Sequence, residues 1–136
     1  MELLILFGRI MFGLVFVAAA LGHLTDTKTL ARQAQKRGIP RAQLAVQLTG
    51  AAILLGAVSV MFGVYPDVGA LILVAFLLAT AGTIHRFWSD PVGDTRITTQ
   101  THFMKDLALA GGALALFGFF VQVGDGLGYT FTGPLF

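Results

Sequence analysis

The chain has 136 residues, of which 56% are hydrophobic and only 12% charged, and its mean hydropathy is +0.81. A water-soluble domain carries about twice that fraction of charged residues, so the composition predicts a membrane protein with no separate water-facing domain. Cysteine is absent, which excludes disulfides, thiolate catalysis and thiolate metal ligands. The net charge of +2 comes from basic residues that flank apolar segments without any nucleic-acid-reading motif. We therefore expect the lipid bilayer, and no nucleic acid, as their partner.

Four apolar segments of membrane-spanning length follow one another along the chain, since roughly 20 residues of helix cross a bilayer. They are residues 3–24, 44–64, 68–85 and 103–123. All four prolines lie between or beyond these segments, as expected for helices whose backbone must be hydrogen-bonded internally in lipid. The first segment contains Arg9 and is too long for the apolar part of a signal peptide, so we interpret it as a retained span. The sequence predicts one domain over residues 1–136, an all-α membrane protein built as an antiparallel four-helix transmembrane bundle.

The three connections between the segments differ in character. The first, 25–37, has apolar residues on one side and basic residues on the other and ends at Gly38, which predicts a short interfacial helix. The second, 65–67, has room only for a tight turn between antiparallel neighbours. The third, 89–101, is polar and rich in threonine, and we expect a loop there.

The basic residues also predict an orientation. They are concentrated in the first and third connections, whereas the second connection and both termini have none. By the positive-inside rule the first and third connections are cytoplasmic, which places both termini outside in a multi-pass protein of the cell inner membrane.

Small residues spaced four apart predict close contacts between helices. The sequence does not fix the oligomeric state, and a homo-oligomer is one option. The spaced pairs are Ala18 with Gly22, Ala52 with Gly56, Ala108 with Gly112, and Gly111 with Ala115.

Polar and aromatic side chains gather at the span ends that face the first and third connections, and we predict that they line one mouth of the bundle. The candidate ligand-binding residues are His23, Gln47, His85, Trp88, His102, Phe103, Lys105 and Asp106. Simpler roles compete with this one, because Asp106 suits a helix N-terminus and Trp88 suits the aromatic belt of a membrane protein. The histidines do not have metal-ligand spacing, so no metal site is predicted.

Arg9 is the one deeply placed cation, about 9 Å inside the opposite face at 1.5 Å of rise per residue. Ionisable residues within spans are costly and usually face the bundle interior or water. We expect its guanidinium to turn inward or toward Gln122 or Asp125 near the end of the fourth span. The alternative is that the side chain reaches the outer interface.

Three sequence elements together resemble the DoxX family of small bacterial and archaeal membrane proteins. They are the opening RIMFGLVFVAAALGHL, the GIP after the basic connection, and HRFW followed, after a polar loop, by HFMKDLALAGGALAL. The resemblance runs from about Arg9 to Phe120 and implies a four-helix membrane bundle. The matched positions are Arg9, Gly22, His85, Phe87, Trp88, Phe103, Lys105, Asp106, Gly111 and Gly112. Many relatives have asparagine where this chain has Asp106.

The family's best-known association is with a membrane thiosulfate to quinone oxidoreductase, in which a DoxX-like small subunit accompanies a partner chain, and other members are linked to redox complexes. We therefore expect an integral-membrane subunit of a redox complex that binds a quinone at the mouth. Donors to the quinone carbonyls would be His85, His102, Lys105 and Gln47, with Trp88 and Phe103 beside the ring and Asp106 or a histidine handling the proton.

The sequence has no haem motif and no dinucleotide loop, so the electrons are expected from a protein partner or a bound cofactor. Two other functions compete. The first is a non-catalytic scaffold or assembly subunit whose mouth is a docking surface for cytoplasmic proteins. The second is a small-molecule transporter, which is disfavoured because apolar layers separate Arg9 from the mouth.

Overall fold

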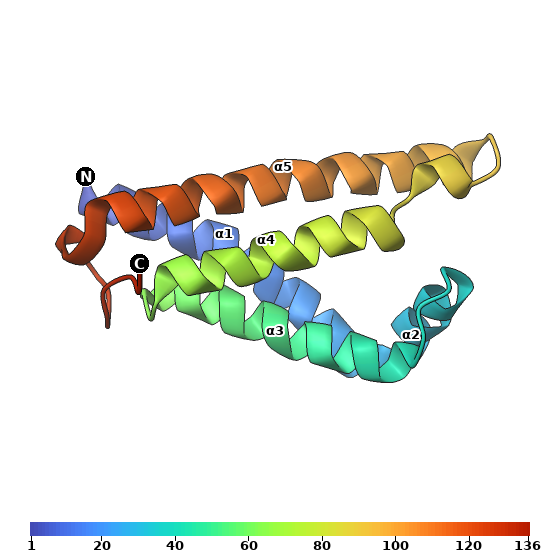
Figure 1. Cartoon of the computed structure of the whole chain (residues 1–136), viewed down its shortest axis with the longest axis horizontal. Helices are drawn as coiled ribbons and strands as arrows, with labels where there is room; N and C mark the ends of the chain where they lie inside the picture. Colours follow the sequence, from blue (N-terminus) through green and yellow to red (C-terminus); the bar gives the residue numbers. More distant parts are fainter.

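The computed structural model describes all residues, 1–136, and contains helices and no strands. The four long helices run antiparallel in sequence order, so both termini lie at one end of the molecule, here called the terminal end (Figure 1). The opposite end, which holds α2 and the connection between α4 and α5, is called the α2 end. The elements are α1 (Glu2–Thr25), α2 (Thr27–Lys36), α3 (Ala42–Phe62), α4 (Pro66–Thr83), the short turn η1 (Phe87–Ser89), α5 (Asp94–Val123) and the turn η2 (Gly124–Gly126).

All four long helices are long and apolar enough to cross a membrane. Only 17% to 33% of the most apolar stretch of each span is buried within the protein, and leucine, valine, phenylalanine and methionine side chains cover much of the outer surface. A surface of this kind fits contact with lipid tails, because a soluble monomer rarely exposes large continuous apolar patches. The predicted four-helix membrane bundle is confirmed, and the chain is a multi-pass membrane protein.

Small residues allow the closest contact between spans. A Cβ atom on Gly56 would lie 3.0 Å from Leu73 Cδ2 and 3.1 Å from the Gly69 carbonyl oxygen, so α3 and α4 meet almost backbone to backbone. The predicted close contact is therefore present at Gly56. Gly22 and Gly111 have no such neighbour within 4 Å, so neither glycine brings two spans of this chain into close contact.

The predicted short helix between the first two spans is present as α2. Its apolar side is short, and Ala31 and Ala34 are buried on it against Ala42 and Val46 at the start of α3. Because α2 rests on α3 through these alanines, its basic side is left free at the α2 end of the bundle.

The predicted loop over 89–101 is wrong from Asp94 onward, because α5 begins there and runs unbroken to Val123. The threonines that favoured a loop are accommodated within the helix. The hydroxyl of Thr99 donates to the carbonyl of Thr95 at 2.9 Å, as other threonines of helices do when they bond back by one turn. As a result α5 extends past the ends of the neighbouring spans at the α2 end (Figure 1).

At the terminal end, Arg9 completes the C-terminus of α3. The last carbonyl groups of a helix lack partners within it, and Arg9 donates to two of them, from Nε to Val60 O at 2.8 Å and from Nη2 to Met61 O at 3.0 Å. Its side chain is 1% exposed, so it does turn inward. The predicted partners Gln122 and Asp125 are wrong, since both are exposed and unpaired with Arg9.

The C-terminal segment folds back over the same end and supplies the other partners of Arg9, which the sequence did not predict. Arg9 also donates to the carbonyls of Gly128 and Tyr129, at 3.3 and 3.2 Å. Further along, the fully buried carboxylate of Asp67 accepts the backbone N–H groups of Leu135 and Phe136 at 2.8 and 3.0 Å. Backbone carbonyls therefore bind Arg9 and backbone amides bind Asp67. Because every residue has such backbone groups, the sequence cannot show which of them will be the partners.

Candidate functional site

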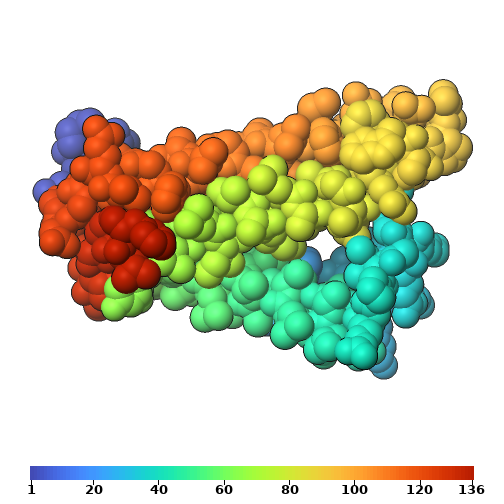
Figure 2. Space-filling model, in the orientation of Figure 1, coloured from blue at the N-terminus to red at the C-terminus, as the bar shows by residue number.

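A cavity of about 560 Å³ lies at the α2 end, and all five α-helices contribute to its lining. Figure 2 shows the molecule hollowed here, between the end of α4 and the segment formed by α2 and α3. Sixteen of its 24 lining residues are hydrophobic, and this space is called the apolar cavity below. Its size and its mainly apolar lining match those of small-molecule sites, which occupy about 300 to 1,000 Å³.

The polar end of the apolar cavity is formed by a histidine and a carboxylate from different spans. His85 follows α4, where its backbone N–H still bonds to the carbonyl of Thr80 at 3.0 Å. Its Nδ1 lies 2.6 Å from Oδ2 of Asp106, which is 3% exposed on α5. With Nδ1 donating to the carboxylate, Nε2 is the free ring nitrogen, and it has no partner within the protein. Lys105 adds a positive charge, with Nζ 4.0 Å from Asp106 Oδ1.

A second cavity, of about 590 Å³, adjoins the first, and nine of its ten lining residues are polar or charged. It lies between α2, the end of α4, η1 and the extension of α5, and is called the polar vestibule below. Its lining residues are Gln33, Lys36, Arg37, Ile84, His85, Arg86, Ser89, Asp90, Thr99 and His102. Gln33, Ile84 and His85 line both cavities. His85 is therefore the ionisable residue at the boundary between polar and apolar space, and His102 stacks on it with the ring centroids 5.1 Å apart.

One comparison with known proteins gives a match. A protein-family model described as DoxX covers residues 4–86, which is more than half of the chain. The chain belongs to the DoxX family. Neither the comparison with curated proteins nor that with solved structures gives a match.

The DoxX match extends from α1 to the residue after His85. It does not include α5, so Asp106 and Lys105, which complete the polar end of the cavity, lie outside the matched region. Family membership therefore establishes the kind of membrane protein, whereas the reaction has to be argued from the site itself.

In this DoxX protein five of the eight predicted mouth residues line one of the two cavities. His85, Lys105, Asp106 and His23 line the apolar cavity, and His102 lines the polar vestibule. The Nδ1 atom of His23 lies 3.1 Å from the Thr49 hydroxyl, so it is already engaged within the protein.

Gln47 is not brought to either cavity, because its side chain is exposed. It follows Val46, which faces inward, and one residue along a helix turns the side chain by about 100°. The sequence suggested Gln47 because of its depth along the span, but it did not predict that the side chain points outward.

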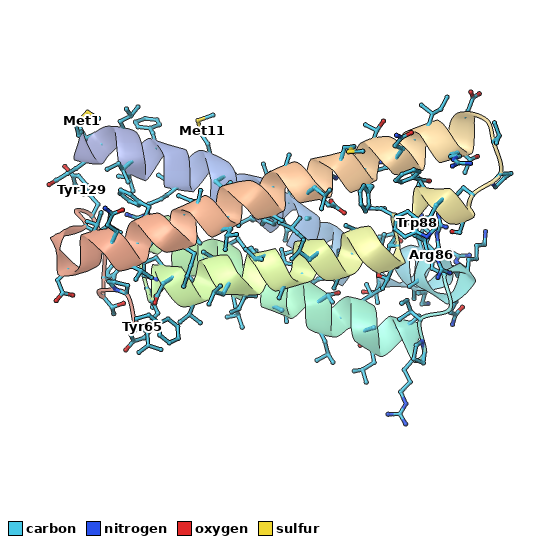
Figure 3. All side chains as sticks on the ribbon, turned by 45° about the horizontal axis from the view of Figure 1, so that its top comes forward. Met1, Met11, Tyr65, Arg86, Trp88 and Tyr129 are labelled. Carbon is cyan, nitrogen blue, oxygen red and sulfur yellow. The ribbon has the colours of Figure 1, made fainter.

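Trp88 and Phe103 form an aromatic cluster with Phe87 outside both cavities. The three ring centroids lie 5.4 to 5.6 Å apart in edge-to-face pairs, and Trp88 is 54% exposed at the α2 end (Figure 3). The structure therefore does not place Trp88 or Phe103 beside a ligand in the apolar cavity. An exposed, tilted aromatic group at the end of a span fits the membrane interface.

The sequence analysis did not predict the ion pair between Arg37 and Asp90, two residues that line the vestibule. Arg37 donates to both carboxylate oxygens of Asp90, at 2.7 and 3.0 Å, and joins the end of α2 to the connection before α5. Hydrogen bonds from Arg37 hold the pKa of Asp90 below its usual value. The two residues are 53 positions apart, and no spacing rule connects an arginine after one helix with an aspartate in a distant loop.

Proposed function

We propose that this DoxX-family protein is the ligand-binding subunit of a membrane redox complex and that it holds the headgroup of a quinone in the apolar cavity. The observation that carries this proposal is the His85–Asp106 pair, because it places a proton-exchanging group at the polar end of a cavity that is otherwise apolar. A quinone needs this combination, since its ring and tail are apolar while its carbonyl oxygens require hydrogen-bond donors.

The geometry supports a defined role for each residue. Reduction of a quinone takes two electrons and two protons, and negative charge develops on a carbonyl oxygen before the proton arrives. Asp106 accepts the Nδ1–H of His85 and orients the ring, and a proton on Nε2 is donated to that oxygen. The ring also lines the polar vestibule, where it takes up the second proton and transfers it in turn. In the reverse direction the neutral ring accepts the proton of a quinol. Lys105 contributes positive charge beside the same carboxylate.

The route of entry fits a lipid-soluble ligand. Val15, Ala75 and Ala79 line the apolar cavity and are also exposed, so the cavity reaches the apolar surface of the spans. An isoprenoid tail can remain in the bilayer while the headgroup lies near His85. We assign electron delivery to a protein partner at the α2 end, and we propose that this end faces the cytoplasm of a cell inner membrane because its connections hold the basic residues.

The test compares variants at the polar end of the cavity with a control outside it. We expect His85→Ala and Lys105→Ala to weaken quinone binding about ten- to a hundredfold, the value of one charged hydrogen bond. Gln47→Ala is the matched control, because Gln47 starts at the same depth but is exposed, and its binding should equal that of the parent. The measurement is the quinone extracted from protein purified in mild detergent, together with titration of a short-tailed quinone analogue in nanodiscs.

Unchanged binding in both cavity variants would contradict the proposal, as would a parent protein that binds no quinone in nanodiscs. In either case a scaffold role would take its place. Cross-linking from the exposed residues near Asp94 would then be expected to capture a cytoplasmic partner.

A further inference from the structure

Arg86 is a partly buried cation that makes no direct ion pair. It follows His85 at the end of α4, and Figure 3 places it beside α2. Its Nη2 donates to the backbone carbonyl of Arg37 at 3.0 Å, whereas its Nε is buried and has no hydrogen-bond partner. The ion pairs of the protein join Arg37 with Asp90, and His85 and Lys105 with Asp106. None of them involves Arg86, so its charge is not compensated by direct contact.

The space around Arg86 carries an excess of positive charge. The polar vestibule is lined by three permanent cations, Lys36, Arg37 and Arg86, and by one carboxylate, Asp90. Three positive charges and one negative charge leave a net charge of +2 with the two histidines neutral. Asp90 is held by Arg37 at 2.7 and 3.0 Å, so it does not provide Arg86 with a direct partner.

The position of the vestibule suggests which kind of anion could bind to Arg86. It lies at the α2 end of the four spans, where lipid headgroups meet the protein, and it continues into the apolar cavity through Gln33, Ile84 and His85. Basic pockets between spans at this level are suited to acidic lipid headgroups. An arginine offers several N–H donors in a fixed planar arrangement that matches phosphate oxygens.

We propose that the polar vestibule binds a phosphate group, with Arg86 as the main donor and Lys36 as a second charge. The phosphate belongs to an anionic phospholipid headgroup or to a free phosphate ion, which share this chemistry. The site is separate from the quinone site, because it uses the guanidinium of Arg86 and needs no ligand in the apolar cavity.

The two sources are distinguished by separate titrations of the full-length protein. In the first, phosphatidylglycerol is added at increasing mole fraction to protein in a neutral detergent, with phosphatidylcholine as the uncharged comparison, and bound lipids are counted by native mass spectrometry. In the second, inorganic phosphate is added to lipid-free protein and binding is followed through the fluorescence of Trp88, the single tryptophan, which is adjacent to Ser89 of the vestibule lining.

The variants are Arg86→Gln and Lys36→Gln, with Arg32→Gln as the control. Arg32 is an exposed cation on the same helix as Lys36 and does not line the vestibule. Arg86→Gln should weaken binding about ten- to a hundredfold. Lys36→Gln, which alters an exposed residue and should leave folding intact, should weaken it by up to about fivefold. Arg32→Gln should have no effect.

Preferential binding of phosphatidylglycerol that is lost in Arg86→Gln supports the lipid as the source, and saturable phosphate binding lost in the same variant supports the free ion. The proposal is overturned if the parent binds neither probe. It is also overturned if Arg86→Gln binds either probe as tightly as the parent does, or if Arg32→Gln weakens binding as much as Arg86→Gln, because the attraction would then be a general property of the basic surface.

Discussion

Replacing Arg9 with methionine should destabilise the bundle strongly while leaving it inserted in the membrane. The change removes two short hydrogen bonds, to Val60 O at 2.8 Å and Met61 O at 3.0 Å, and two longer ones to Gly128 and Tyr129. Each buried carbonyl left without a partner costs about 1 to 3 kcal/mol, so the two α3 carbonyls together cost about 2 to 6 kcal/mol. Burying methionine instead of a cation removes a desolvation cost, and we therefore expect a net loss of about 2 to 4 kcal/mol.

The free energy of unfolding is measured by titrating the purified protein with SDS in mixed micelles. Arg9→Lys should fall between the parent and Arg9→Met, because one ammonium group lacks the planar fork that reaches α3 and the tail together. Arg32→Met, on the exposed side of α2, is the control and should stay within about 0.5 kcal/mol of the parent.

A second measurement tests the tail directly. Since Arg9 holds the carbonyls of Gly128 and Tyr129, limited chymotrypsin digestion should cleave the segment after Tyr129 faster in Arg9→Met than in the parent. An Arg9→Met protein that resists SDS as well as the parent does, or better, would refute the view that these carbonyls depend on the guanidinium.

Three further outcomes are expected. Gly69→Ala should cost about 1 to 3 kcal/mol in the same SDS assay, because its Cβ would overlap the Ser59 side chain on α3 and lie 2.9 Å from the Gly56 carbonyl oxygen. Gly82→Ala, with nothing within 4 Å, should be neutral or stabilising, and equal effects would contradict the close contact of α3 and α4. The pKa of Asp90 is lowered from its ordinary value of 3.8. The Arg37–Asp90 pair therefore contributes its full stability above about pH 4 and loses it as the pH falls through the folded-state pKa. SDS titrations at decreasing pH should show this loss of stability in the parent and a smaller loss in Arg37→Gln. Alkaline phosphatase fused after Phe136 should be active in a bacterial host, whereas activity only of a cytoplasmic reporter would reverse the proposed orientation.

The spans could be predicted from the sequence because length and hydropathy are local properties of the chain. The limits of α5 could not be predicted in the same way. A polar stretch such as Asp94–Thr101 is consistent with a loop or with a helix that extends beyond the apolar region, and only its contacts with neighbouring elements decide between them. In the structure this stretch is helical, and the hydroxyl of Thr99 donates to a carbonyl of its own helix.

For the candidate site, the sequence predicted how far along each span the polar side chains lie, but it did not predict which way they point. Counting residues along each span brought His85, Lys105 and Asp106 to the same level, and these three residues do meet. The same count included Gln47, which lies on the outward side of α3, and the aromatic residues, which form a cluster of their own. Which way a side chain points depends on how neighbouring helices are rotated, and the apolar composition of a membrane helix on nearly all sides hides that rotation.

The two ends of the bundle satisfy their polar groups differently, and this difference argues for where a ligand binds. At the terminal end the carbonyls that close α3 are bonded, and the buried charges Arg9 and Asp67 are held by backbone groups, although one oxygen of Asp67 has no partner. At the α2 end Arg86, which lines the polar vestibule, has a buried Nε donor without a protein partner, and Nε2 of His85 is also unbonded within the protein. An unpaired donor away from water is costly. A cavity that adjoins such a donor can admit a group that removes this cost, and a closed, well-packed end cannot. The α2 end therefore has both the room and the unmet hydrogen-bonding capacity that binding requires.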